Sequence, residues 1–244
     1  MQKAIRIIAV VLVLGFIGYL IVVGSINNEK AQKEPWVAEM SLGDRENAEH
    51  VFYDYTDILC PFCNKFAIAV DAHMDEFKSY LEEHKIYYEI RLTDLLAKFH
   101  PESEATVSNS HLSARGGYCA AEKNKFWEWY GWILTKLNDD YYQYDIGTAP
   151  GKQMIPKLDK EYFTAVGEAI EGLDQEFMDS CIESDEIIAK VNKYTKKAAN
   201  TVKGGLPYYV FGGKVMTGFD GNWEVEHDWN QAKLMFEAGI ASGK

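Results

Sequence analysis

A Cys-Pro-Phe-Cys stretch at Cys60–Cys63 is the feature that most restricts how this chain can fold. It directly follows an apolar and aromatic run over residues 50–55, which predicts a strand. It precedes residues 64–83, where apolar side chains recur every three or four positions and predict a helix. The two cysteines are therefore expected in the first turn of a helix that begins where a strand ends.

That position favours redox chemistry. The first turn of a helix has unpaired backbone N–H groups and the positive end of the dipole, and both stabilise a thiolate, the reactive form of cysteine. Pro61 fits there because its missing N–H costs nothing. We interpret Cys60 as the nucleophile of a dithiol/disulfide couple and Cys63, one turn further in, as the resolving thiol.

Two other interpretations of the cysteine pair stay open, half of a zinc site and an inert disulfide. A tetrahedral zinc site needs further ligands. The sequence has no second CxxC and no HxxxH pattern, so we favour the redox couple and expect no metal.

An uninterrupted apolar run over residues 7–23 follows Lys3 and Arg6. Its length reaches the lower end of the roughly 17–25 residues that span a bilayer as a helix. The positive flank should stay in the cytoplasm. We predict a transmembrane anchor over 1–24. The alternative is a cleaved signal peptide, although the apolar core of such peptides is usually shorter, about 7–15 residues.

In either case the rest of the chain is exported, to a periplasm or a cell surface, where disulfides persist. The net charge of −12 gives no electrostatic footprint for nucleic acid, so we exclude a nucleic-acid partner. We interpret the acidity as a contribution to solubility.

The remaining pattern predicts an α/β chain with a long helical middle. Residues 25–42 are polar and predict a stalk. Further strands are expected at 86–92, 208–211 and 214–219, with a hairpin turn at Gly212-Gly213. Helices are expected through most of 94–202, with a segment capped by Ser184, and again at 228–238. One helical stripe is expected to run from Cys119 through Phe126 to Leu137, and a short helix over 174–183 to place Phe177 and Cys181 on one face. Residues 139–156 are rich in Tyr, Gly and Pro and predict a loop.

The order of these elements resembles the DsbA-like branch of the thioredoxin superfamily over roughly residues 43–241. The similar stretches are VFYDYTD running into CPFC, Tyr118-Cys119-Ala120 before Lys125–Glu128, the short helix around 177–181, and GGLPYYVFGGKVMTG. The resemblance implies a thioredoxin-like domain formed by 43–93 and 203–244, an inserted helical domain over 94–202, and the N-terminal transmembrane anchor.

The resemblance also implies roles at the site. Asp54, six residues before Cys60, would be buried behind Cys63 and relay its proton; the alternative is a strand aspartate that faces solvent. Pro207 would be a cis-proline that exposes the backbone of Leu206 to an extended substrate; the alternative is an ordinary proline before a strand. Leu206 stands where the family often has Thr or Val. Pro61, Phe62 and Leu206 are the expected substrate contacts.

Cys119 and Cys181 both fall on predicted apolar helix faces. In an exported chain this favours a structural disulfide between them, with two separate buried thiols as the alternative. An aromatic-rich stretch near Trp127 is expected mainly in the core, and its remaining members could line a groove for apolar substrate. It comprises Phe126, Trp127, Trp129, Tyr130 and Trp132, with Tyr141, Tyr142 and Tyr144 further along.

The sequence thus predicts a membrane-tethered thiol-disulfide oxidoreductase, with oxidase as the favoured direction. It would act on unfolded or folding exported proteins with free thiols and need no cofactor beyond the Cys60–Cys63 disulfide. The resemblance implies a quinone-linked membrane partner for reoxidation. The alternatives are a reductase or isomerase of the same fold, and a non-catalytic, chaperone-like peptide-binding module.

Overall fold

The structure is a computed structural model that describes residues 35–98, 109–142, 158–166 and 169–242. The chain divides into two compact units, 1–36 and 37–244, and every described helix and strand belongs to the second. The predicted anchor and most of the predicted stalk lie outside the described residues. In the part of the chain that is described, no helix is long and apolar enough to cross a membrane.

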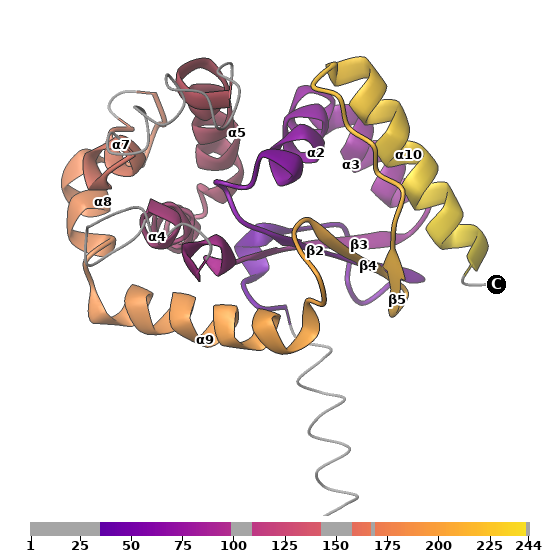
Figure 1. The fold of residues 1–244 in the computed structure, drawn as a ribbon, viewed down its shortest axis with the longest axis horizontal. Helices are drawn as coiled ribbons and strands as arrows, with labels where there is room; N and C mark the ends of the chain where they lie inside the picture. The colour runs from indigo at the N-terminus through magenta and orange to yellow at the C-terminus, as the bar shows by residue number, and fades with distance from the viewer. Residues whose placement is uncertain (1–34, 99–108, 143–157, 167–168, 243–244) are drawn as a thin grey trace, which may run out of the picture. The chain divides into compact units, whose positions relative to one another are not determined.

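The second unit is built on a five-stranded sheet with the order β1-β3-β2-β4-β5 (Figure 1). β2 and β3 are parallel, and the other neighbouring pairs are antiparallel. The strands are β1 (Ser41–Leu42), β2 (His50–Thr56), β3 (Ile86–Leu92), β4 (Tyr208–Phe211) and β5 (Lys214–Met216). β1 lies within the range expected as a stalk, where Met40 is buried beside it.

Three helices cover one face of the sheet: α2 (Pro61–Ala72), α3 (Met74–Glu83) and α10 (Val225–Ser242) (Figure 1). They form because each places apolar side chains on the side that meets the strands. Phe52 of β2, Phe66 of α2 and Phe236 of α10 are fully buried and meet at ring-centroid distances of 4.8 to 6.3 Å. This aromatic layer holds α2, and therefore the CPFC turn, against the sheet.

The segment between β3 and β4 is helical, as predicted. Its described elements are η2 (Leu95–Lys98), α4 (Asn109–Glu122), α5 (Phe126–Leu137), η3 (Asn138–Tyr142), α7 (Lys160–Thr164), α8 (Gln175–Cys181) and α9 (Asp185–Thr201). Ser184 caps α9 by accepting the Ile187 N–H, as expected. α9 contacts β3 and runs along the side of the sheet opposite α2 and α10 (Figure 1).

Two expected helices are each broken in two. The predicted helix over 64–83 is interrupted at His73, whose ring stacks on Trp229 at 5.3 Å and whose Nε2 meets Glu226. The stripe predicted to join Cys119 to the Phe126 helix is wrong, because Asn124 adopts a left-handed backbone with φ +55° and separates α4 from α5. An asparagine tolerates that conformation and ends helices in this way.

The strand ends follow the glycines. Gly212 and Gly213 have φ values of +55° and +82°, which a two-residue hairpin between β4 and β5 requires. β5 stops at Met216, three residues earlier than predicted, and Gly218 shortly afterwards has φ +104°. The predicted loop over 139–156 begins later than expected, since η3 continues α5 as a π-helical turn up to Tyr142.

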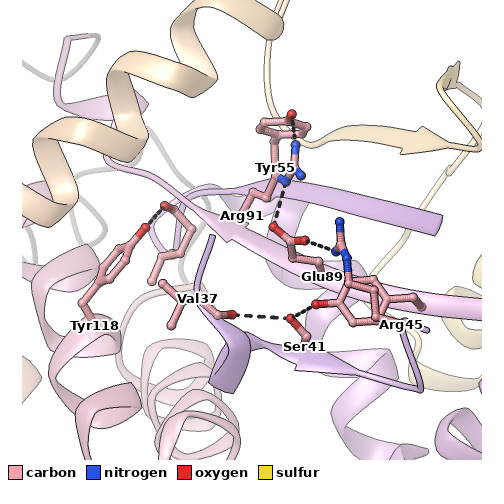
Figure 2. A network of polar contacts seen from close by, with 9 residues as sticks. Val37, Ser41, Arg45, Tyr55, Glu89, Arg91 and Tyr118 are labelled. Carbon is pink, nitrogen blue, oxygen red and sulfur yellow. Dashed lines mark hydrogen bonds and ion pairs between the residues drawn. The ribbon is translucent and has the colours of Figure 1, made fainter. Parts of the chain in front are cut away.

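Figure 2 shows a buried polar network around Glu89 and Arg91 of β3. Because these residues pair with Tyr53 and Tyr55 of β2, the alternation of side chains along the strand places them on the face opposite Phe52. Glu89 is fully buried and accepts from Arg91 Nε at 3.0 Å and from Arg45 at 3.3 Å. Arg91 also donates to the Tyr55 hydroxyl at 2.6 Å, and the Tyr55 ring meets Tyr208 at 5.9 Å. Two guanidinium groups compensate the desolvated carboxylate. The network therefore connects β3 to the start of β4, immediately after Pro207.

The structure joins Cys119 of α4 to Cys181 of α8 in a disulfide, with 5.8 Å between the Cα atoms. In α8 the buried partner of Cys181 is Met178, whereas Phe177, expected on that face, is partly exposed. Phe126, Trp129 and Tyr130 of α5 are buried in the core, as the sequence suggested for most of the aromatic stretch.

We expect the double variant Cys119→Ala/Cys181→Ala to lose about 4 kcal/mol of unfolding free energy, because the disulfide closes a loop with a sequence separation of 62. Urea unfolding of the oxidised full chain measures this loss. The measurement is repeated with excess reductant, where the unfolding free energies of wild type and variant should become equal. A difference that persists under reduction would mean that lost sulfur packing, rather than the cross-link, causes the effect.

Candidate active site: a buried dithiol at a helix N-terminus

Cys60 is the N-cap residue of α2, and Pro61 occupies the first turn. The Cys60 sulfur accepts the backbone N–H of Cys63 at 3.4 Å. The turn before it is fixed by the Cys60 N–H, which donates to the Asp57 carbonyl at 2.9 Å, and by the Asn64 side-chain amide, which donates to the Ile58 carbonyl at 2.7 Å. The predicted position of the pair at the strand-to-helix turn is thus what the structure has.

The loop before β4 closes over the first thiol. The Cys60 sulfur lies 3.6 Å from the carbonyl oxygen of Leu206, and the Leu206–Pro207 peptide bond is cis. Cys60 is only 3% exposed and Cys63 2%, whereas Phe62 between them is 60% exposed. Both thiols are free. The predicted substrate contacts Phe62 and Leu206 therefore lie beside a sulfur that is itself almost covered.

Cys63 is buried and holds its proton strongly. Its burial, together with the adjacent sulfur of Cys60, raises the pKa of the Cys63 thiol well above the usual range. Because the thiolate is the form that attacks a disulfide, Cys63 needs a neighbouring group that accepts its proton.

Asp54 lies in the same buried region. It is 2% exposed on the Phe52 side of β2, so the solvent-facing alternative does not apply. Tyr88 donates to its Oδ2 at 2.8 Å, and burial raises the pKa of Asp54 to about 7. Asp54 and Cys63 both interact electrostatically with the phenols of Tyr130 and Tyr209. A carboxyl that titrates near neutral pH can take up or release a proton there.

Asp57 is not among the residues predicted from the sequence. It is fully buried, and its carboxylate accepts the Leu59 N–H at 3.0 Å, the Leu96 N–H at 3.0 Å and the Ser110 hydroxyl at 2.5 Å. Burial outweighs these donors and raises the pKa of Asp57 to about 7. A sequence signal existed, since an aspartate that opens a turn commonly accepts the N–H two residues ahead.

A cavity of about 310 Å³ opens next to the dithiol. Its wall is formed by Phe62, Lys65, Leu206, Pro207, Tyr209 and Met216, together with residues 217–221. It combines apolar side chains with the backbone of the cis-proline loop, so an extended chain could add backbone hydrogen bonds there. Among the described residues, no group of three or more His, Cys, Asp or Glu side chains is placed to hold a metal ion.

The sequence of this chain matches a known protein family, and its fold is similar to those of solved structures. A family model described as "Thioredoxin" matches residues 37–208. The chain belongs to the thioredoxin family. The predicted resemblance is confirmed at this level, and the thioredoxin-like α/β fold with its inserted helices is established. No curated protein matches the chain by sequence.

Solved structures of similar fold are distant in sequence. Oxidised BdbD from Bacillus subtilis is 14% identical with a TM-score of 0.57, covering 83% of this chain and 92% of that one. MdbA, a thiol-disulfide oxidoreductase from Corynebacterium diphtheriae, is 15% identical with a TM-score of 0.54, covering 78% and 90%. α-DsbA1 from Wolbachia pipientis is 15% identical with a TM-score of 0.52, covering 84% and 94%. At these identities the likeness concerns the fold.

We expect the stability of the wild-type chain to fall as pH rises from about 4 to about 7. A carboxyl whose pKa is raised on folding binds its proton more tightly in the folded state, so its contribution is lost on deprotonation. For Asp54, whose pKa rises from 3.8 to about 7, the contribution is up to roughly 4 kcal/mol. Asp54→Asn should therefore match wild type near pH 4 and exceed it near pH 8.

Urea unfolding at a series of pH values measures this difference. Asp75→Asn, which changes an exposed aspartate on α3, is the matched control and should leave the profile unchanged. If the unfolding free energies of wild type and Asp54→Asn differed by the same amount at every pH, the claim that burial raises the pKa of Asp54 would be contradicted.

Proposed function

We propose that the protein is a thiol-disulfide oxidoreductase that works through Cys60 and Cys63. One observation carries the proposal: the Cys60 sulfur caps α2 and lies between the Cys63 N–H at 3.4 Å and the Leu206 carbonyl at 3.6 Å. The first contact stabilises developing negative charge on sulfur, and the second sets the thiol beside backbone that can pair with a substrate chain. The fold shared with MdbA, itself described as such an enzyme, supports the same chemistry.

In the oxidising direction, a substrate thiolate attacks the Cys60 sulfur of the Cys60–Cys63 disulfide. The bond between the two cysteines breaks, and Cys63 leaves as a thiolate that takes a proton, with Asp54 as the proposed proton donor. A second substrate thiolate then attacks the substrate sulfur of the mixed disulfide and releases Cys60. The substrate loses two electrons and the cysteine pair gains them, so no further cofactor is needed for this step.

We further propose that the domain acts outside the cytoplasm on folding proteins with free thiols. The apolar run over 7–23 supports tethering to a membrane. The Cys119–Cys181 disulfide supports an oxidising compartment. After each turnover the reduced pair requires an electron acceptor, and a quinone-linked membrane protein is the partner we propose for that step.

The reduced Cys63→Ser variant should accumulate a mixed disulfide between Cys60 and a substrate that carries a disulfide. Cys60 attacks that disulfide and displaces one substrate thiolate, and Cys63, the thiol that would then attack the Cys60 sulfur and free the substrate, is gone. The probe is scrambled ribonuclease, which carries non-native disulfides, and the product is separated on a non-reducing gel. Cys60→Ser should form no such adduct, and Cys119→Ala/Cys181→Ala should still behave as wild type. Full activity of Cys60→Ser would instead favour a non-catalytic, chaperone-like role.

The reduction potential of the pair decides the direction of transfer. Equilibration of the full chain with glutathione buffers should give a value near about −120 mV, as for a strong exported oxidant. A value near about −270 mV would assign the protein to reductases and remove the oxidase proposal.

A further inference from the structure

Trp223, in the segment before α10, has a strained backbone conformation. Its φ is +74°, in the left-handed region that bulky side chains rarely adopt outside functional sites. The conformation is held by Asp228, which is 1% exposed and accepts the Trp223 N–H at 3.1 Å and the Asn222 N–H at 2.7 Å. A buried carboxylate thus fixes the direction in which this indole points.

The indole contacts the helical segment between β3 and β4. It stacks on Tyr142 of η3, with ring centroids 5.4 Å apart and an interplanar angle of 30°. The Tyr142 hydroxyl donates to the carbonyl of Ile58, two residues before Cys60, at 3.1 Å. Tyr142 also interacts electrostatically with both Cys60 and Cys63. The aromatic pair therefore runs from the turn that carries Cys60 to the loop that precedes α10.

The other side of the indole faces α2. Lys65 Nζ lies 5.4 Å from the Trp223 ring and 5.2 Å from the Phe62 ring, and donates to the Gly221 carbonyl at 2.7 Å. Trp223 is 38% exposed although it contacts both Tyr142 and Lys65, whereas Cys60 is 3% exposed. The ring is thus partly at the surface, whereas the thiol is covered.

We propose that Tyr142 and Trp223 form an aromatic barrier that determines which thiols reach Cys60. This inference rests on the proposed function and adds a substrate preference to it. Attack on sulfur needs a direct approach, so the barrier must open first. A polypeptide that fills the cavity at Phe62, Leu206 and Pro207 gains contacts that offset the opening, whereas a small thiol such as glutathione gains none. The barrier therefore favours cysteines within polypeptide chains.

The first test measures access to Cys60 without any turnover. The reduced full chain is alkylated with iodoacetamide over a series of pH values, and modification at Cys60 is quantified by peptide mass spectrometry. Trp223→Gly should raise the high-pH plateau of the rate about two- to twelvefold, the range that corresponds to loss of one aromatic stacking contact. The midpoint of the rate against pH should not move, because the barrier limits the approach of the reagent and leaves the fraction of Cys60 present as thiolate unchanged.

Variants separate this effect from damage to the fold. Trp223→Gly suits the left-handed backbone, so it removes the ring without adding strain. Trp223→Phe keeps a ring for Tyr142 and should retain most of the protection. Leu234→Ala removes an exposed apolar side chain, 57% exposed, from α10 and should change nothing. Equal plateaus for wild type and Trp223→Gly would overturn the barrier, as would a rate gain explained by a shifted midpoint alone.

The second test measures the preference itself. The oxidised full chain is reduced either by glutathione or by a ten-residue peptide with one cysteine between aromatic residues. Trp223→Gly should speed the glutathione reaction by a larger factor than the peptide reaction. The same factor for both thiols would overturn the preference. A wild type that fails to oxidise ribonuclease would count against the proposed function, while the alkylation result would still stand or fall by itself.

Discussion

The carboxylate of Asp57 connects the CPFC turn at Cys60–Cys63 to the helical segment between β3 and β4, and the geometry around the dithiol depends on that connection. Its three donors come from Leu59 in the turn, Leu96 after β3 and Ser110 at the start of α4. The backbone carbonyl of the same residue accepts the Cys60 N–H. A buried carboxylate is costly unless such donors surround it, and each donor would in turn be left unsatisfied without it. The arrangement is therefore favourable only when the turn and the helical segment are both in place.

Asp54 lies near the end of β2 and Asp57 directly after it, but the two carboxyl groups have different hydrogen-bond partners. Burial brings the pKa of both to about 7. Asp57 is saturated with donors, which suits a structural role. Asp54 accepts one hydrogen bond, from Tyr88, and in the described part of the chain nothing donates to its Oδ1. An acid with spare acceptor capacity, in the same buried region as a thiol that resists ionisation, is the better candidate for moving a proton.

Local sequence rules predicted the elements whose ends are set by nearby residues. The CPFC turn, the Gly212-Gly213 hairpin and the Ser184 cap lie where such rules expect them. The missed features depend on distant partners. Asn124 breaks a helix whose apolar spacing continues across it, and Trp223 takes its conformation from buried Asp228. Neither apolar periodicity nor turn composition carries information about such tertiary partners.

Two of the contacts that hold the helical segment between β3 and β4 bear on the site differently. Asp57 fixes the inserted segment to the chain just before Cys60 through a buried hydrogen bond from Ser110 and a part-buried one from Leu96. In the Tyr142–Trp223 stack, by contrast, Tyr142 is buried but Trp223 is 38% exposed, so water and incoming side chains compete for the indole. A site joined firmly at its base and weakly at its mouth can admit a substrate without disturbing the α2 N-terminus. That separation allows access to change while the hydrogen bond from the Cys63 N–H to the Cys60 sulfur stays in place, since that N–H belongs to the buried part.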